Sequence, residues 1–195
     1  MVEISRSPEP AELAQFRATH PSPADFNAEA FQPIKWSIKS QLNQDQGGLC
    51  AYCESYLAHN SGQIDHVKPK GGRRGFPELS FVYTNFVHSC CHNPKHCGQQ
   101  KKDGILPIEP GHGCNDLFAL GSLDGMISPL VSANKRQRHD VRQTIGMLGL
   151  NHSTLRLERK RWVKSAREVL TKYPEDFSEF IKDKPFRFIL RRQLA

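Results

Sequence analysis

The chain has 195 residues, of which 37% are hydrophobic and 24% are charged, and its formal net charge is +7. This composition indicates a globular protein and argues against a disordered one. With no run of about 18 apolar residues we expect no membrane-spanning helix, and the first ten residues lack the apolar stretch of a signal peptide. We therefore expect a cytoplasmic protein. Its basic charge favours nucleic acid as a partner, because cationic side chains that neutralise phosphates release counterions.

The N-terminal quarter is expected to hold an arm followed by a helix. Residues 1–23 are rich in proline and polar side chains, which is typical of irregular structure. Apolar residues at roughly helical spacing predict a helix over residues 24–43. Pro33 should kink or break it, and the sequence Gln46-Gly47-Gly48 should end it. The apolar positions are Phe26, Phe31, Ile34, Ile38 and Leu42.

The next segment, residues 49–103, is rich in glycine and cysteine, and we expect short elements there. Strands are predicted over residues 49–52, around residues 64–67, and over residues 81–83. A short helix should begin near Gly98 and carry Lys101 and Lys102. Residues 104–133 are expected to form loops with short extended pieces.

The C-terminal third is predicted to be helical. One helix should span residues 135–148 and close at Gly149, and a second should run from about residue 153 to residue 173 and stop at Pro174. The tail from Glu175 onward is amphipathic. The side chains of the second helix that should face the core are Leu155, Trp162, Val163, Ala166, Val169 and Leu170. Its basic side should carry Arg156, Arg159, Lys160, Arg161, Lys164 and Arg167. Trp36 and Trp162 are both expected in the core or in an interface with a partner.

The cysteines point to a local metal site. All six lie between residues 50 and 114, whereas disulfides would be spread more widely in the chain. Cys50 and Cys53 form a C-x-x-C knuckle, and Cys90 and Cys97 supply a second pair, so we expect one tetrahedral Zn²⁺ held by these four. The alternatives for the knuckle alone are a redox pair or two buried small side chains. A short glycine-rich segment buries little apolar surface, and zinc–thiolate bonding can stabilise it.

Two further cysteines compete for this site. Cys91 competes with Cys90, since two adjacent cysteines rarely ligate one ion. Cys114 either substitutes for one of the four or has no part in the site.

Asp65 and His66 suggest hydrolytic chemistry beside the zinc knuckle. A histidine has a pKa near neutrality and can take a proton from water. The Asp65 carboxylate offers a hard oxygen ligand to Mg²⁺ or Mn²⁺, and Asn85 can hydrogen-bond backbone groups of the His66 loop and hold the ring. A histidine in a loop is, by itself, more often solvated or structural. Cations that can contact phosphates are Lys68, Lys70, Arg73, Arg74 and Lys101.

The order of these motifs resembles that of the HNH endonucleases, and more closely that of the PtuB-like nucleases of Septu and retron anti-phage systems. The matching stretches are DQGGLCAYCE (45–54), IDHVKPK (64–70), YTNFVHSC (83–90), HCGQQKKD (96–103), ILPIEP (105–110) and TIGMLGLN (144–151). The resemblance implies an α+β fold, mostly helical overall, with a zinc-knuckle ββα-metal core and flanking helices. It divides the chain into an N-terminal arm and helix (1–43), the core (44–104) and a helical C-terminal extension (105–195).

The resemblance also implies a function. The expected activity is metal-dependent cleavage of nucleic acid by an anti-phage effector that works with a separate ATPase subunit of the PtuA type. The flanking helices, 24–43 and 135–183, are then expected to dock on that partner, which would restrain the site. The chain departs from the family at Gly98, where HNH enzymes usually carry a third active-site His or Asn. Gln99, Asn93 or His96 are candidate replacements. The alternative function is a zinc-knuckle module that binds nucleic acid or protein without cleaving it.

Overall fold

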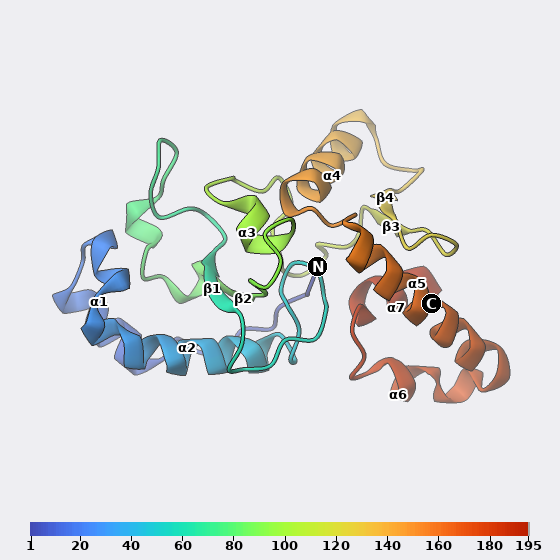
Figure 1. Cartoon of the computed structure of the whole chain (residues 1–195), viewed down its shortest axis with the longest axis horizontal. Coiled ribbons are helices and arrows are strands. Elements are labelled where there is room, and N and C mark those ends of the chain that lie inside the picture. Colours follow the sequence, from blue (N-terminus) through green and yellow to red (C-terminus); the bar gives the residue numbers. More distant parts are fainter. Residues whose placement is uncertain (195) are drawn as a thin grey trace.

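The computed structural model describes residues 1–194, which form helices and two small two-stranded sheets. Helices α1 (Ala11–Thr19) and α2 (Gln32–Asp45) lie at one end of the long axis, and the last three helices lie at the other end (Figure 1). The sheet formed by β1 (Gln63–His66) and β2 (Phe86–Ser89) lies between them. This mixture of helices and small sheets agrees with the predicted α+β class.

The predicted irregular arm is wrong for residues 11–19, which form α1. Leu13 and Phe16 are its buried residues, and this short stretch has too few apolar positions to reveal a helical period. Packing decides its structure instead. The Phe16 ring lies 4.6 Å from the Phe31 ring and 5.5 Å from the Phe81 ring, centroid to centroid.

The helix predicted over residues 24–43 begins later, at Gln32, and continues to Asp45. Residues 23–31 form two 3₁₀ turns, Pro23–Asn27 and Glu29–Phe31. Pro33 lies in the first turn of α2, where its missing N–H leaves no hydrogen bond unmade, so it starts the helix rather than kinking it. The predicted glycine stop is confirmed, since Gly47 and Gly48 have φ values of 60° and 72°.

Strand β1 forms where it was predicted, and it pairs with β2, which was not predicted. The two strands are antiparallel, with Gln63 opposite Ser89 and His66 opposite Phe86. The strand predicted over residues 81–83 is wrong, because Phe81 and Tyr83 are buried in a loop and a 3₁₀ turn, while the four buried residues of β2 pair with β1. The strand predicted over residues 49–52 is also wrong. That segment is a turn with one isolated bridge, between Leu49 and Tyr56.

The remaining elements follow the predictions closely. The short helix α3 spans Cys97–Lys101, and the loop region 104–133 contains strands β3 (Phe118–Leu120) and β4 (Ile127–Pro129). Helix α4 spans Lys135–Leu148, with Gly149 in a left-handed conformation at its end. The last three helices are α5 (Ser153–Lys172), α6 (Phe177–Ile181) and α7 (Arg187–Leu194).

Two buried clusters hold these elements together. The N-terminal cluster consists of Leu13, Phe16, Phe26, Phe31, Ile38, Leu42, Phe81, Tyr83 and Phe86. The central cluster contains Cys50, Cys53, Cys90 and Cys97 together with apolar residues of α4, α5, α6 and α7. The cysteine-rich segment therefore shares its core with the C-terminal helices.

One side chain lies where the sequence did not place it. Arg159 was expected on the basic face of α5, but it is fully buried and donates to the backbone oxygens of Gly125 and Leu150. Trp36 was expected in the core or in an interface with a partner, and it is 57% exposed on α2, which rules out the core and leaves the interface as a prediction. No helix among the described residues is long and apolar enough to cross a bilayer.

Candidate functional site

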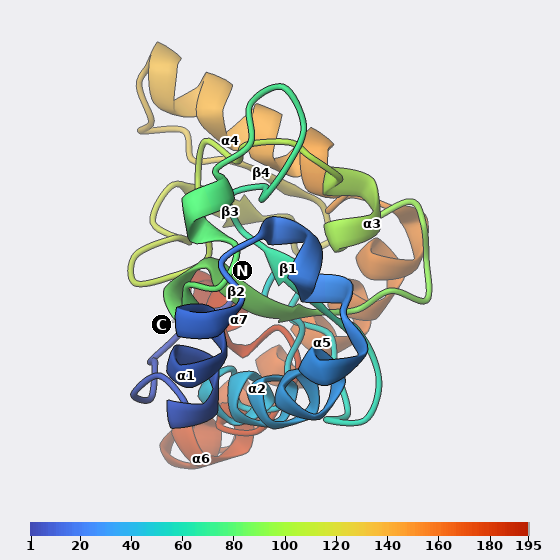
Figure 2. The same cartoon turned by 90° about the vertical axis from the view of Figure 1, so that its left-hand side faces the viewer.

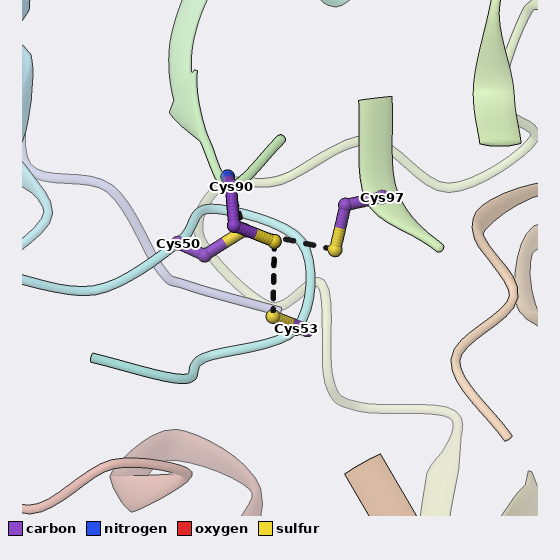
Figure 3. A group of neighbouring side chains, drawn as sticks. All are labelled: Cys50, Cys53, Cys90 and Cys97. Carbon is purple, nitrogen blue, oxygen red and sulfur yellow. Dashed lines mark hydrogen bonds between the residues drawn. The ribbon is translucent and has the colours of Figure 1, made fainter. Parts of the chain in front are cut away.

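Four cysteine side chains converge beside the β1–β2 sheet. Cys50 and Cys53 come from the turn before β1, Cys90 follows β2, and Cys97 starts α3. Their sulfur atoms all lie within 4.8 Å of one another, and all four residues are buried (Figure 3). The Sγ atoms of Cys50 and Cys97 are 3.7 Å apart, and those of Cys53 and Cys90 are 3.9 Å apart.

This geometry suits a tetrahedral metal ion. Zinc–sulfur bonds of about 2.3 Å place the sulfurs of a tetrahedral site about 3.8 Å from one another. The four cysteines form no disulfides. Burial raises the pKa of the Cys97 thiol, so a cation at the centre of the cluster would be needed to hold it as a thiolate. The site can therefore bind a metal such as zinc.

The competing side chains lie outside this cluster. Cys91 is exposed, although it is adjacent to Cys90. Cys114 is buried elsewhere, with its Sγ 3.5 Å from the carbonyl oxygen of Met1. His96 lies at the edge of the cluster, with its Nδ1 3.1 Å from the Sγ of Cys97, so it faces the sulfurs rather than Asp65.

His66 ends β1 and is held in one orientation. Its Nε2 lies 3.0 Å from the carbonyl oxygen of Ser80, and a carbonyl only accepts, so Nε2 carries the proton and Nδ1 keeps a free lone pair. The rings of Phe26 and Phe86 pack against it edge-on, at 4.7 Å and 5.0 Å between centroids. Burial lowers the pKa of His66 to about 4, although the hydrogen bond to Ser80 opposes this. The imidazole is therefore neutral at pH 7, although this lower pKa makes it a weaker base than a free histidine, and Nδ1 is the atom that can accept a proton.

Asp65 points to the opposite face of β1, as strand alternation requires. Its Oδ2 accepts a hydrogen bond from the Tyr52 hydroxyl at 2.5 Å and lies 3.4 Å from Nζ of Lys101. Neither contact uses Oδ1. Burial raises the pKa of Asp65, while Lys101 and Tyr52 act against that rise. The side chains of Asp65 and His66 thus flank the end of β1 from its two sides.

Asn85 clamps the loop that follows His66. Its Oδ1 accepts from the backbone N–H of Lys68 at 2.8 Å, and its Nδ2 donates to the carbonyl oxygens of Lys68 and Leu79 at 3.0 Å and 3.1 Å. The backbone N–H of Val67 also donates to the Asn85 carbonyl. All polar atoms of the amide are used in holding the backbone next to His66.

The five cations of the predicted phosphate path have different surroundings. Arg73 and Arg74 are exposed in the loop after β1. Lys68 and Lys70 are half-buried, and Nζ of Lys70 donates to the carbonyl oxygen of Pro23 at 3.1 Å. Lys101 is only 4% exposed and faces Asp65. The structure therefore places Lys101 inside the site rather than on an exposed path.

Gly98 faces Asp65 directly. A Cβ atom built on Gly98 would lie 3.1 Å from Cγ of Asp65 and 3.0 Å from Nε2 of Gln63. A side chain at position 98 would therefore project onto the Asp65 carboxylate. Gln63 partly occupies this space, and its Oε1 accepts a hydrogen bond from Nε2 of Gln99 at 2.8 Å.

The sequence arguments missed several neighbours of these residues. Gln63 precedes Asp65 by two positions, and strand alternation could have placed it on the Asp65 face. Tyr52 lies inside the C-x-x-C knuckle, where the metal argument gave it no role. Phe26 and the carbonyl of Ser80 contact His66 from distant parts of the chain, and no local pattern announces such contacts.

A protein of Vibrio cholerae serotype O1 biovar El Tor resembles this chain along nearly its whole length. The two chains are 38% identical over 202 residues, which cover 98% of each of them. That protein is named "Retron Vc95 putative HNH endonuclease". No protein-family model matches the chain.

Proposed function

Because the chain belongs to the HNH endonuclease family, we propose that it hydrolyses phosphodiester bonds of nucleic acid. The proposal includes a structural Zn²⁺ on the four cysteines and a catalytic Mg²⁺ or Mn²⁺ at Asp65. The observation that carries it is the orientation of His66. This ring keeps its Nδ1 lone pair while Nε2 donates to Ser80, and it stands at the end of β1, with the Asp65 carboxylate on the other face of the strand.

Each residue has a role in this proposal. His66 takes the proton from the attacking water, since its imidazole is neutral at pH 7. A divalent cation bound at Asp65 would offset the charge that develops on the phosphate. Asn85 acts as a positioning residue through the backbone of Val67 and Lys68. Lys68, Lys70, Arg73 and Arg74 would contact phosphates along the loop, whereas the buried Lys101 would act on Asp65.

The resting site is shielded. His66 is only 8% exposed, and Phe26 covers its ring from the 3₁₀ turn Pro23–Asn27. Access of a substrate to this ring would require Phe26 to move, which suits a nuclease that is restrained until it is activated. We propose that the flanking segments 24–43 and 135–183 supply this control by contacting an ATPase partner.

The wider setting is part of the same proposal. The name of the Vibrio cholerae relative assigns that protein to a retron. We propose that this chain is likewise a nuclease effector of an anti-phage defence system, similar to the PtuB-like proteins, and that it acts in the cytoplasm beside a PtuA-like ATPase.

Metal-resolved cleavage tests the activity. The wild type, His66→Ala and the control His59→Ala are incubated with plasmid, single-stranded DNA and tRNA, with Mg²⁺ or Mn²⁺, and zinc is counted in each protein. His59 lies on an exposed loop and serves as the matched histidine. We expect the wild type and His59→Ala to cut at least one substrate, and His66→Ala to lose roughly 100-fold or more of the rate.

One pattern of results would overturn the activity. If all three proteins hold zinc and none cuts, even with the ATPase partner present, the chain is a zinc-knuckle binding module. Gly98, which lacks a side chain that could ligate a cation beside Asp65, is the observation that favours this second function.

A further inference from the structure

An open hollow lies on the α2 side of strand β1. Its volume is about 280 Å³, and residues of both α2 and β1 line it, with α2 lying below β1 in Figure 2. The residues of α2 that line it are Gln32, Lys35, Trp36 and Lys39. The other lining residues are Phe26, Gly62, Gln63 and Ile64. This hollow is separate from the cysteine cluster and from the Asn85 loop.

Trp36 is the unusual member of the hollow. Its side chain is 57% exposed, although tryptophan is a residue that a folded chain normally keeps largely buried. Nζ of Lys39 lies 4.3 Å from the centroid of the indole ring, a cation–π contact that restrains the ring on the surface. A large, flat, restrained aromatic ring is therefore presented to solvent.

The charge around the ring selects the kind of ligand. Lys35 and Lys39 line the hollow, and none of its lining residues in the described chain is acidic. Gln32 adds an amide group that both donates and accepts hydrogen bonds. An aromatic platform between cations, with an amide at its edge, matches an unpaired nucleobase with phosphates on either side of it.

The hollow is also close to the proposed reaction centre. Phe26 lines it and at the same time packs against the ring of His66, with 4.7 Å between the centroids. Gln63 and Ile64 lie in the same strand as Asp65 and His66. A base held at Trp36 would therefore place its nucleic-acid strand next to β1.

We infer that the hollow is a binding site for an unpaired nucleobase of single-stranded nucleic acid, which stacks on Trp36 while Lys35 and Lys39 contact its phosphates. This inference rests on the proposed function for its biological meaning, but it concerns binding and does not require cleavage. It also gives the nuclease a preference for single-stranded over fully paired substrate, because a base inside a duplex cannot reach the ring.

Tryptophan fluorescence tests the stacking directly. The chain has two tryptophans, so Trp162→Phe leaves Trp36 as the reporter. This protein is titrated with a short single-stranded DNA, with an RNA of matching sequence, and with an abasic strand of the same length, without added Mg²⁺ or Mn²⁺. We expect quenching by the DNA or the RNA, which identifies the preferred sugar, and little quenching by the abasic strand.

Affinity provides the second measurement. Anisotropy of a labelled single strand is followed for the wild type, Trp36→Ala, Trp36→Phe and the control Tyr173→Ala, whose side chain is equally exposed just after the end of α5. Trp36→Ala should weaken binding by roughly 5- to 100-fold, as expected for the loss of one stacked base. Trp36→Phe should keep most of the affinity, and Tyr173→Ala should bind like the wild type.

Three results would overturn the inference. The first is a strand that binds without changing Trp36 fluorescence, and the second is equal affinity of Trp36→Ala and the wild type. In both cases Trp36 belongs to a contact with a protein. The third is a wild type that binds no single strand. Cleavage is scored separately with metal, so an inactive protein that still shows base-dependent quenching refutes the nuclease proposal alone.

Discussion

At the scale of single residues, position 98 sets what the Asp65 side of the site can bind. Family resemblance places an Asn or His there, and this chain has Gly98. The distances are informative, because a Cβ at position 98 would lie 3.1 Å from Cγ of Asp65. The backbone is thus placed to aim a side chain at the carboxylate, and only the side chain is missing.

We predict that Gly98→Asn strengthens divalent cation binding. The amide oxygen would add a ligand beside Asp65, and Gln63 and Asp65 need to move by only a few tenths of an ångström to admit the new Cβ. The Mn²⁺ concentration for half-maximal cleavage should fall by roughly 10-fold, a gain of about 1.4 kcal/mol. Calorimetric Mn²⁺ titration of the protein measures the same change without cleavage.

Gly98→Ala is the matched control for this prediction. It introduces the same Cβ crowding but offers no oxygen, so it should bind Mn²⁺ no better than the wild type. Equal Mn²⁺ affinities for Gly98→Asn and Gly98→Ala would mean that position 98 does not face a cation site.

At the scale of elements, Glu54 connects the cysteine knuckle to helix α7. It is 1% exposed, and its Oε2 accepts from the backbone N–H groups of Phe188 and Ile189 at 2.9 Å and 3.4 Å. Its own carbonyl accepts from the N–H of Phe186. The carboxylate therefore meets the unpaired N–H groups and the positive end of the helix dipole.

We predict that Glu54→Ala lowers the free energy of unfolding by about 2 kcal/mol, because it leaves buried donors without an acceptor. Urea unfolding followed by circular dichroism measures this. The control is Glu158→Ala, which removes an exposed carboxylate that accepts from the Ser55 hydroxyl at 3.2 Å. Its effect should stay below about 0.5 kcal/mol. Similar losses of unfolding free energy in both variants would show that the contact of Glu54 with α7 stabilises the fold no more than an exposed hydrogen bond does.

Elements with a strong local pattern were predictable from sequence, and elements chosen by distant packing were not. Helix α4 has an Asn134 cap, a sustained apolar stripe and a glycine stop, and its predicted bounds are those observed. A strand is predicted over residues 81–83, which hold aromatic and β-branched residues that favour strands. Those aromatic side chains instead fill the N-terminal cluster, and residues 86–89 pair with β1.

The same distinction applies to single side chains on predicted helices. Helical periodicity could place Leu155, Val163 and Ala166 inside, and they are buried. It could not foresee that Arg159 would be buried and would donate to the carbonyl oxygens of Gly125 and Leu150, since those acceptors lie outside α5. The cysteine cluster was predictable because spacing alone marks metal-ligand pairs, whereas the Phe26 contact with His66 depends on the tertiary fold.

At the scale of the whole molecule, the four cysteines join parts of the chain that are far apart in sequence. They belong to the central cluster, which also contains Val163 of α5, Ile181 of α6 and Leu190 of α7. A metal at this point would hold the knuckle, the end of β2 and the start of α3 together, and the C-terminal helices pack on that unit. Loss of the metal should therefore destabilise the chain well beyond residues 50–97.

The neighbouring residues Cys90 and Cys91 allow this to be tested with matched variants. Cys90 is 1% exposed and lies in the cluster, whereas Cys91 is exposed. We predict that Cys90→Ser loses zinc and lowers the unfolding temperature by roughly 10 °C or more. Cys91→Ser should keep about one zinc per chain and unfold like the wild type. Metal analysis and calorimetry give both values.

Amide hydrogen exchange decides how far the effect reaches. If the metal stabilises the whole central cluster, Cys90→Ser will increase exchange in α5 and α7 as well as around the knuckle, because these helices share one buried core with it. Exchange that rises only in residues 50–57 and 86–97 would contradict this and limit the metal to a local clamp. Zinc loss in Cys91→Ser, with zinc kept in Cys90→Ser, would mean that the wrong cysteine of the pair has been assigned to the metal.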